Sequence, residues 1–213
     1  MSDVTDPARW EGLATSVISD ALNRFQVMQG GIRGLSGGRL FGPAYPVRAM
    51  VGENSVIHRA VAQAPPGAVL VVDAEGHVDR AVWGDVLTVA ALAGGVAGAV
   101  VDGAVRDLEA IRERGFCLFA RGVSAAGPHK GWEGTIGRPV QCGGVVVAKG
   151  DLVIGDGDGV VVVPAELVET TLEGASAARE RERGWIDRIQ GGETSARVLG
   201  LDGSDHEERN EAP

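Results

Sequence analysis

An arginine and an aspartate stand side by side at Arg106-Asp107, where a short apolar run gives way to a predicted helix. The run 99–101 is typical of a buried strand, a tight turn is expected at Asp102-Gly103, and Gly115 is expected to end the helix. A guanidinium beside a carboxylate suits an anionic substrate that is held next to a metal ion. The junction between a strand end and a helix start is where α/β proteins commonly place such groups.

Each member of this pair also has an ordinary structural interpretation. Asp107 at a helix start can cap the helix or offset its dipole, a contribution of about 1 kcal/mol. Arg106 faces the positive end of the helix dipole, which is locally unfavourable. An anionic ligand bound by Arg106 and by nearby backbone N–H groups would remove this conflict. An intramolecular ion pair of Arg106, for example with Glu109 or Glu113, is the structural alternative.

A second corner lies at Gly84-Asp85, where another predicted helix begins. Glycine there lets a ligand carboxylate approach the backbone N–H groups closely, and Asp85 could reach water on a metal across the pocket. An acid in a first helical turn is otherwise a partner for the helix dipole. The four histidines have no metal-ligand spacing, and surface roles are expected for His129 and Lys130 in their polar loop.

The other elements follow from hydrophobic periodicity and turn residues. We expect helices at 7–25 with a break near Thr15, 54–63, 84–93, 106–115 and 165–189, and strands at 41–51, 68–74, 99–101, 117–120 and within 140–164. Prolines make 41–51 resemble an edge or irregular strand, and valine-rich runs in 140–164 predict a β-meander. Helices and strands alternate before the hairpins, so the fold is predicted to be α/β with a partly antiparallel sheet.

Composition predicts one substantial domain. The 213 residues are 44% hydrophobic and carry a net charge of −9 without a basic cluster, which argues against nucleic-acid binding. No apolar run is long enough to span a membrane. Cys117 and Cys142 are far apart and fit a reducing compartment, and the first ten residues lack a signal-peptide pattern, so we expect a cytoplasmic location. A domain at 1–199 and an acidic, disordered tail at 200–213 are predicted.

Four stretches together resemble the RraA-like family. They are GDVLTVAALAGGVAGAVVDGAVRD at 84–107, SDAL at 19–22, GPA at 42–44, and CGGVVVAKGDLVIGDGDGVVVVP at 142–164. The family contains class II 4-hydroxy-4-methyl-2-oxoglutarate/4-carboxy-4-hydroxy-2-oxoadipate aldolases and regulators of ribonuclease E activity. The resemblance covers nearly the whole chain except the tail. It implies a single-domain swivelling β/β/α sandwich, similar to a phosphohistidine domain, with a long C-terminal helix. It also implies homotrimers that can pair into hexamers, with active sites between subunits.

The same resemblance implies roles for individual residues. Asp107 would be the sole protein ligand of Mg²⁺, Mn²⁺ or another divalent cation, and Arg106 would bind the carboxylate and keto oxygen of a pyruvyl group. Asp85 would hold water on the metal. An acid on the C-terminal helix of a neighbouring subunit, Glu182 or else Glu180, would help to activate water. The substrate carboxylate would be held by backbone N–H groups of Gly84, Asp85, Val86 and Leu87.

The activity implied is metal-dependent retro-aldol cleavage of 4-hydroxy-2-oxo acids to pyruvate and a second keto acid, with oxaloacetate decarboxylation as a side activity. Catalytic members often carry an acid three residues after the metal-binding aspartate, where this chain has Ala110 with Glu109 beside it. Because Arg106 and Asp107 are both present, an enzyme is favoured. The alternative is a non-catalytic regulator that binds ribonuclease E or an RNA helicase through its acidic surface.

Overall fold

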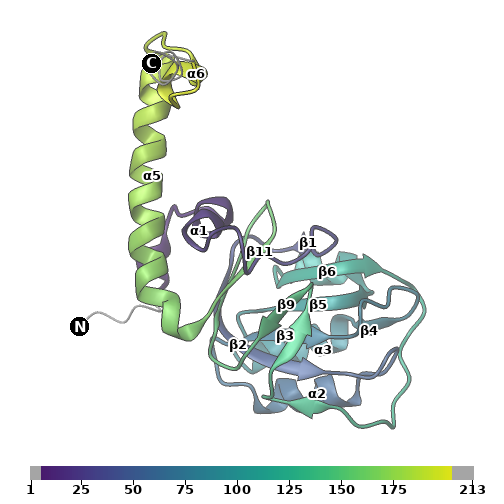
Figure 1. The fold of residues 1–213 in the computed structure, drawn as a ribbon. Helices are drawn as coiled ribbons and strands as arrows, with labels where there is room; N and C mark the ends of the chain where they lie inside the picture. The colour runs from purple at the N-terminus through teal and green to yellow at the C-terminus, as the bar shows by residue number, and fades with distance from the viewer. Residues whose placement is uncertain (1–5, 203–213) are drawn as a thin grey trace, which may run out of the picture.

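The computed structural model describes residues 6–202, which form a curled mixed sheet with helices packed on it and one long helix, α5, that projects from the sheet (Figure 1). The helices are η1 (Pro7–Trp10), α1 (Thr15–Ala21), α2 (Ser55–Gln63), α3 (Asp85–Ala93), α4 (Leu108–Glu113), η2 (Ala165–Leu167), α5 (Val168–Gln190) and α6 (Ser195–Val198), where η denotes a 3-10 helix. The strands are β1 (Arg33–Ser36), β2 (Leu40–Arg48), β3 (Val69–Asp73), β4 (Ala81–Trp83), β5 (Gly98–Val105), β6 (Cys117–Val123), β7 (Thr135–Ile136), β8 (Val140–Cys142), β9 (Val145–Val147), β10 (Leu152–Gly155) and β11 (Val160–Val163).

The sheet combines parallel and antiparallel pairs. Within residues 6–202 nine strands form one sheet in the order β1-β6-β5-β3-β2-β10-β11, with β4 paired to β5 and β7 to β2. The strands β2, β3, β5 and β6 run parallel, whereas β1, β7, β10 and β11 join through antiparallel pairs. These pairings, with the helices between the strands, confirm the predicted α/β class and the partly antiparallel sheet. Helix α5 confirms the predicted long C-terminal helix.

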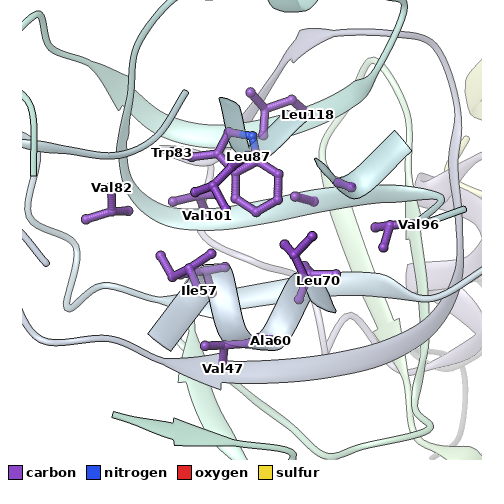
Figure 2. Packing of buried hydrophobic residues seen from close by; sticks show 14 of the residues in the cluster. Val47, Ile57, Ala60, Leu70, Val82, Trp83, Leu87, Val96, Val101 and Leu118 are labelled. Atoms are coloured by element: carbon purple, nitrogen blue, oxygen red, sulfur yellow. The ribbon is translucent and has the colours of Figure 1, made fainter. Parts of the chain in front are cut away.

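The central strands lie inside an aliphatic core. All residues of β3 and β5 are buried, as is usual for parallel strands covered by helices. Figure 2 shows Ile57 of α2 and Leu87 of α3 packed over the side chains of Leu70 and Val101. Trp83, at the end of β4, is also buried here and stacks on Phe116 with 5.8 Å between ring centroids. This packing fixes the start of α3, where the second candidate corner lies.

The predicted turn at Asp102-Gly103 is wrong, because β5 continues through both residues to Val105. The Asp102 carboxylate stays within the sheet because it accepts hydrogen bonds from the Gly143 N–H at 2.6 Å and the Arg121 Nε at 2.5 Å. A register shift follows Val101 in the pairing of β5 with β6. The strand therefore extends directly to Arg106.

Of the two interpretations of 41–51, the edge strand is wrong, because β2 lies between β3 and β10, whereas an irregular strand agrees with the change of partner along β2. Strand β10 pairs with residues 40–43 of β2, and β3 pairs with residues 44–48. The Ala44 N–H donates to the carbonyl of Asp151, so it faces β10. N–H groups alternate sides along a strand, so the nitrogen of Pro43 faces β3. Pro43 lies just before the first residue of β2 that pairs with β3. The nitrogen of Pro46 faces the β10 side after that ladder has ended. Pro43 therefore removes no ladder hydrogen bond, whereas Pro46, whose carbonyl accepts from the Gly137 N–H, cannot donate a bond in return at the end of the β2–β7 pair.

The valine-rich segment forms two hairpins that belong to different sheets. Strands β10 and β11 extend the main sheet, whereas β8 and β9 form a separate two-stranded sheet. The expected β-meander is therefore wrong. Within residues 6–202 no helix has the length and apolar character needed to cross a membrane. Residues 203–213 of the predicted acidic tail lie outside the described residues.

Candidate active site

A cleft of about 360 Å³ lies where α3 begins and β5 ends. It brings together the two corners that the sequence singled out, 84–87 and 106–107. The residues that line it are Asn54, His58, Trp83, Gly84, Val86, Leu87, Arg106, Asp107, Pro128 and Lys130.

Asp107 precedes α4 but does not cap it with its side chain. Its backbone is left-handed, with φ 59° and ψ 35°, and its carboxylate accepts no hydrogen bond from α4. Instead, Oδ2 accepts a hydrogen bond of 3.1 Å from the backbone N–H of Asp85. A left-handed conformation is uncommon for a residue other than glycine and is often found where function requires it. The capping interpretation of this carboxylate is therefore wrong, and the residue lines the cleft instead.

Arg106 is held by its backbone, and its guanidinium lies between Asp107 and Gly127. Its N–H donates to the carbonyl of Trp83 at 2.9 Å, and its Nε lies 3.5 Å from Oδ2 of Asp107. The side chains of Arg106 and Asp107 are 42% and 43% exposed, so the pair is not locked in a dry interior. Among the described residues Arg106 forms no ion pair with Glu109 or Glu113. The intramolecular ion pair of the structural alternative is present, but with Asp107 as the partner.

The N-terminus of α3 presents backbone donors to the same cleft. The first turn of a helix has N–H groups without intrahelical acceptors, and in residues 6–202 those of Val86 and Leu87 donate to no other group. Gly84 precedes them, and a Cβ added to it would lie 2.6 Å from Oδ2 of Asp107. The backbone conformation does not require glycine, because φ of −160° is ordinary extended backbone. Glycine is needed because the Asp107 carboxylate approaches the chain closely.

Asp85 does not line the cleft, in contrast to its expected role. Its carboxylate forms a two-point ion pair with Arg114, with Oδ1 2.5 Å from Nε and Oδ2 2.9 Å from Nη2. The hydrogen bond from Arg114 holds the pKa of Asp85 below its ordinary value. In this structure the backbone N–H of Asp85 takes part in the site, whereas its side chain is engaged outside it.

Three cleft residues were not identified as functional from the sequence. Asn54 precedes α2, yet its amide donates to the carbonyl of Val82 at 3.1 Å instead of capping the helix. Its Oδ1 accepts a hydrogen bond of 3.0 Å from Nζ of Lys130, which also lies 3.4 Å from Nε2 of His58. Lys130 is therefore not simply a surface residue. One indication in the sequence that Lys130 could have a function was its position in the polar loop 121–139.

The acids expected from a neighbouring subunit lie on the projecting helix. Glu182 and Glu180 both belong to α5, and neither lines the cleft of its own chain. A place for either acid at this site therefore requires a second subunit.

The residues present fit a hard divalent cation. Within residues 6–202 no group of three or more His, Cys, Asp or Glu side chains gathers to hold a metal ion, so a closed structural metal site is absent there. The Asp107 carboxylate can supply one oxygen ligand. Mg²⁺ is commonly bound by one or two carboxylates and keeps several waters, so a single acid at an open cleft is compatible with it.

Comparison with known proteins identifies the family. The family model described as Aldolase/RraA matches residues 15–162. A protein of Halalkalibacterium halodurans, named "Putative 4-hydroxy-4-methyl-2-oxoglutarate aldolase", is 38% identical over 182 residues, which is 83% of this chain and 87% of the relative.

Solved structures agree with this assignment. An uncharacterized protein from Pseudomonas syringae pv. tomato superposes with a TM-score of 0.76 and 31% identity, covering 90% of this chain and 95% of that chain. The RNA-processing inhibitor RraA from Thermus thermophilis superposes with a TM-score of 0.66 and 29% identity, covering 71% and 92%. The chain therefore belongs to the RraA-like family.

Proposed function

We propose that this protein is a divalent-metal-dependent aldolase that cleaves 4-hydroxy-2-oxo acids of the 4-hydroxy-4-methyl-2-oxoglutarate type to pyruvate and a second keto acid. One observation carries the proposal: the half-exposed pair Arg106 and Asp107 shares a cleft with the unpaired N–H groups at the start of α3. A cation, a carboxylate and backbone donors in one cleft suit an oxyanion next to a metal ion.

The pyruvyl part of the substrate binds between the two corners. The N–H groups of Val86 and Leu87 donate to its carboxylate, with the helix dipole adding to the attraction. The guanidinium of Arg106 donates to the same carboxylate and to the 2-oxo oxygen. Asp107 holds Mg²⁺ or Mn²⁺, which when bound polarises the 2-oxo group and stabilises negative charge on its oxygen.

Cleavage follows once the 4-hydroxyl loses its proton. The C4 oxygen becomes a carbonyl, the C3–C4 bond breaks, and its electron pair forms the enolate of pyruvate. Arg106 stabilises the developing charge on the enolate oxygen, which is the kind of electrostatic contribution that commonly dominates catalysis. Oxaloacetate would lose CO₂ and give the same enolate, so we expect its decarboxylation as a side activity.

The complete site is proposed to form between subunits of a homotrimer, which can pair into a hexamer. Helix α5 projects from the body of the chain (Figure 1), and its outer half carries Glu182 together with exposed Ile186 and Ile189. Exposed apolar residues on a projecting helix are commonly covered by a partner. An adjacent subunit's Glu182 would then help to deprotonate the substrate hydroxyl through water.

Pyruvate release from 4-hydroxy-4-methyl-2-oxoglutarate and from oxaloacetate tests the proposal. Release should depend on Mg²⁺, stop with EDTA and be lost in Asp107→Ala. Negligible rates of pyruvate release that are the same with and without EDTA would exclude the proposed aldolase activity.

The second candidate is a non-catalytic regulator, which is supported by the related fold of the RNA-processing inhibitor RraA. In that case the acidic chain would bind basic segments of ribonuclease E or an RNA helicase. Capture of such a partner by both the wild type and Asp107→Ala, without turnover by the wild type, would favour this function.

A further inference from the structure

A second cleft lies on the face of the sheet opposite the candidate active site. It has a volume of about 490 Å³, and among the described residues none lines both clefts. Leu70 and Val72 of β3 pack in the same cluster as side chains of α2 and α3, whereas Val71 packs with the β8–β9 hairpin. Because successive side chains of a strand point to opposite faces, Asp73 at the end of β3 points to the hairpin side. The second cleft therefore lies between the sheet and this hairpin.

Five charged side chains line the second cleft, and four of them are paired with each other. Arg121 donates from Nε to Oδ1 of Asp102 at 2.5 Å, and Arg48 donates from Nη2 to Oε1 of Glu75 at 3.0 Å. The fifth charge belongs to Asp73. Three carboxylates and two guanidinium groups leave the cleft with one negative charge.

Asp73 has one carboxylate oxygen without a hydrogen bond. The residue is 7% exposed and is the register partner of Asp102 on the neighbouring strand. Its Oδ1 accepts from the Glu75 N–H at 3.0 Å. Within residues 6–202 its Oδ2 accepts no hydrogen bond, and the Nε of Arg48 lies 3.9 Å away, which is too far for one. A nearly buried carboxylate with an unsatisfied oxygen is stabilised by a cation that donates to it.

The ionisation of Asp73 indicates the same shortage of positive charge. Burial, and to a smaller extent the neighbouring Asp102 carboxylate, raise the pKa of Asp73, and the nearby Arg48 does not offset them. A cation bound at Oδ2 would favour the ionised form.

The residues present suit an organic cation better than a metal ion. In the part of the chain from 6 to 202, no group of three or more His, Cys, Asp or Glu side chains could hold a metal. The other two carboxylates of the cleft are engaged by arginines. A primary ammonium group needs one carboxylate oxygen and carries three N–H donors.

The size and lining of the cleft indicate the kind of molecule that carries this ammonium group. A volume of about 490 Å³ lies within the range of about 300–1,000 Å³ that is usual for small-molecule sites. The amide of Gln141 lines the cleft from β8 and can both donate to and accept from hydroxyl groups. The ligand is therefore expected to be small and polar.

We propose that the second cleft binds a small, hydroxyl-bearing molecule through a primary ammonium group that donates to Oδ2 of Asp73. This inference goes beyond the proposed aldolase and does not rest on it, because the residues that carry it lie outside the candidate active site. The carboxyl ends of parallel strands, where Asp73 and Asp102 lie, are also where α/β proteins commonly bind ligands.

Three related probes test the proposal by ligand-observed NMR titration with Mg²⁺ present. Ethanolamine has both the ammonium and the hydroxyl group. Ethylene glycol replaces the ammonium by a second hydroxyl, and choline keeps the positive charge but has no N–H donor. Both should bind at least about tenfold more weakly than ethanolamine, as expected for loss of one charge-assisted hydrogen bond. Equal binding of either, or no saturable binding of ethanolamine up to about 100 mM, would overturn the proposal.

Variants place the probe in the cleft. Asp73→Asn should lower the affinity for ethanolamine at least about tenfold. Asp158→Asn makes the same change at an exposed acid outside the second cleft and should leave the affinity unchanged. Asp107→Asn should also leave it unchanged. Loss of binding in Asp107→Asn, or unchanged binding in Asp73→Asn, would overturn the assignment.

Arg48→Gln decides the question if urea unfolding shows that Asp73→Asn is not folded. Removal of the guanidinium 3.9 Å from Asp73 makes the cleft more negative, so ethanolamine should bind about threefold more tightly. Damage to the fold would not produce tighter binding. Unchanged or weaker binding in this variant would then overturn the proposal. A wild type that releases no pyruvate would contradict the aldolase and leave these affinities unaffected, so the two failures are distinguishable.

Discussion

The backbone N–H of Asp85 donates to the carboxylate of Asp107 at 3.1 Å, so the two corners of the site are joined directly across 22 residues of sequence. This bond uses the first free donor of α3 to orient the candidate metal ligand. The next donors, on Val86 and Leu87, then face the cleft in which that ligand lies. In the proposed function, one helix N-terminus would therefore set both the position of the metal and the position of the substrate carboxylate.

Replacing Asp107 should abolish metal binding while leaving the fold intact. The carboxylate is half-exposed and does not cap α4, so Asp107→Asn should change the free energy of unfolding by less than about 1 kcal/mol. Pyruvate release should fall by at least about 10²-fold, because the amide is a poor ligand for a divalent cation. Calorimetric titration with Mn²⁺ and urea unfolding would measure the two effects.

Glu113→Gln is the matched control for that variant, since Glu113 is an exposed acid at the end of α4 and outside the cleft. It removes the same charge and should retain both Mn²⁺ binding and turnover. Retention of full activity by Asp107→Asn would contradict the assignment of the metal ligand.

A methyl group on Gly84 should damage the site without straining the backbone. The added Cβ would lie 2.6 Å from Oδ2 of Asp107 and 3.1 Å from Cγ of Arg106. Both side chains must shift, and a displacement near 1 Å can lower the rate by about 10²-fold. We therefore expect Gly84→Ala to lose at least about tenfold in kcat/KM with normal unfolding by urea.

Gly94, at the other end of the same helix, provides the comparison. A Cβ there would meet nothing closer than the Ala90 carbonyl oxygen at 3.5 Å, an ordinary contact, and φ is −82°. Gly94→Ala should retain wild-type kcat/KM. Equal loss in both variants would mean that the helix, and not the close approach to Asp107, is sensitive to the change.

The sequence predicted the positions of helices better than it predicted which distant residues form contacts with each other. Local signals placed α3 and α4 correctly, because Gly84, Asp107 and Gly115 mark helix ends through backbone conformation. The turn expected at Asp102-Gly103 failed because a distant donor, the Gly143 N–H, satisfies the Asp102 carboxylate inside the sheet. Turn propensity depends only on neighbouring residues, so it cannot predict a contact between residues 41 positions apart.

The candidate site shows the same division. Arg106 and Asp107 could be predicted because a charge pair at a strand-to-helix junction is a local pattern. The bond between Lys130 and Asn54 joins residues 76 positions apart, and the ion pair between Asp85 and Arg114 joins residues 29 apart. Neither follows from spacing along the chain, since the tertiary fold alone brings these groups together.

Asp156 should stabilise the fold by capping α1 from another element. The cap residue of α1 is Ala14, which has no side-chain acceptor, and Asp156 accepts hydrogen bonds from the Thr15 N–H at 2.8 Å and the Thr15 hydroxyl at 2.6 Å. We expect Asp156→Asn to lose about 1 kcal/mol of unfolding free energy at pH 7. Asp158→Asn, an exposed acid in the same turn, should lose less than about 0.5 kcal/mol.

Acid should remove the contribution of Asp156. Burial opposes its ionisation, but the hydrogen bonds from Thr15 outweigh burial and hold the pKa below the ordinary 3.8. Because the folded-state pKa is the lower one, the stabilisation is complete above about pH 3.8 and is lost as pH falls further. The difference in unfolding free energy between wild type and Asp156→Asn should therefore shrink below that pH. A difference that stays constant would show that the charge has no role.

Mixing two inactive variants tests whether the active site is shared between subunits. If the cleft uses its own Asp107 and a neighbour's Glu182, then Asp107→Asn and Glu182→Gln homo-oligomers should both be impaired. In a ring that has been dissociated and reassembled from equal amounts, about a quarter of the interfaces pair an intact Asp107 with an intact Glu182. Pyruvate release by the mixture should therefore exceed that of either variant, whereas mixing without subunit exchange should not increase it. If pyruvate release does not increase although subunits have exchanged, then Asp107 and Glu182 act within the same subunit or Glu182 takes no part in the reaction.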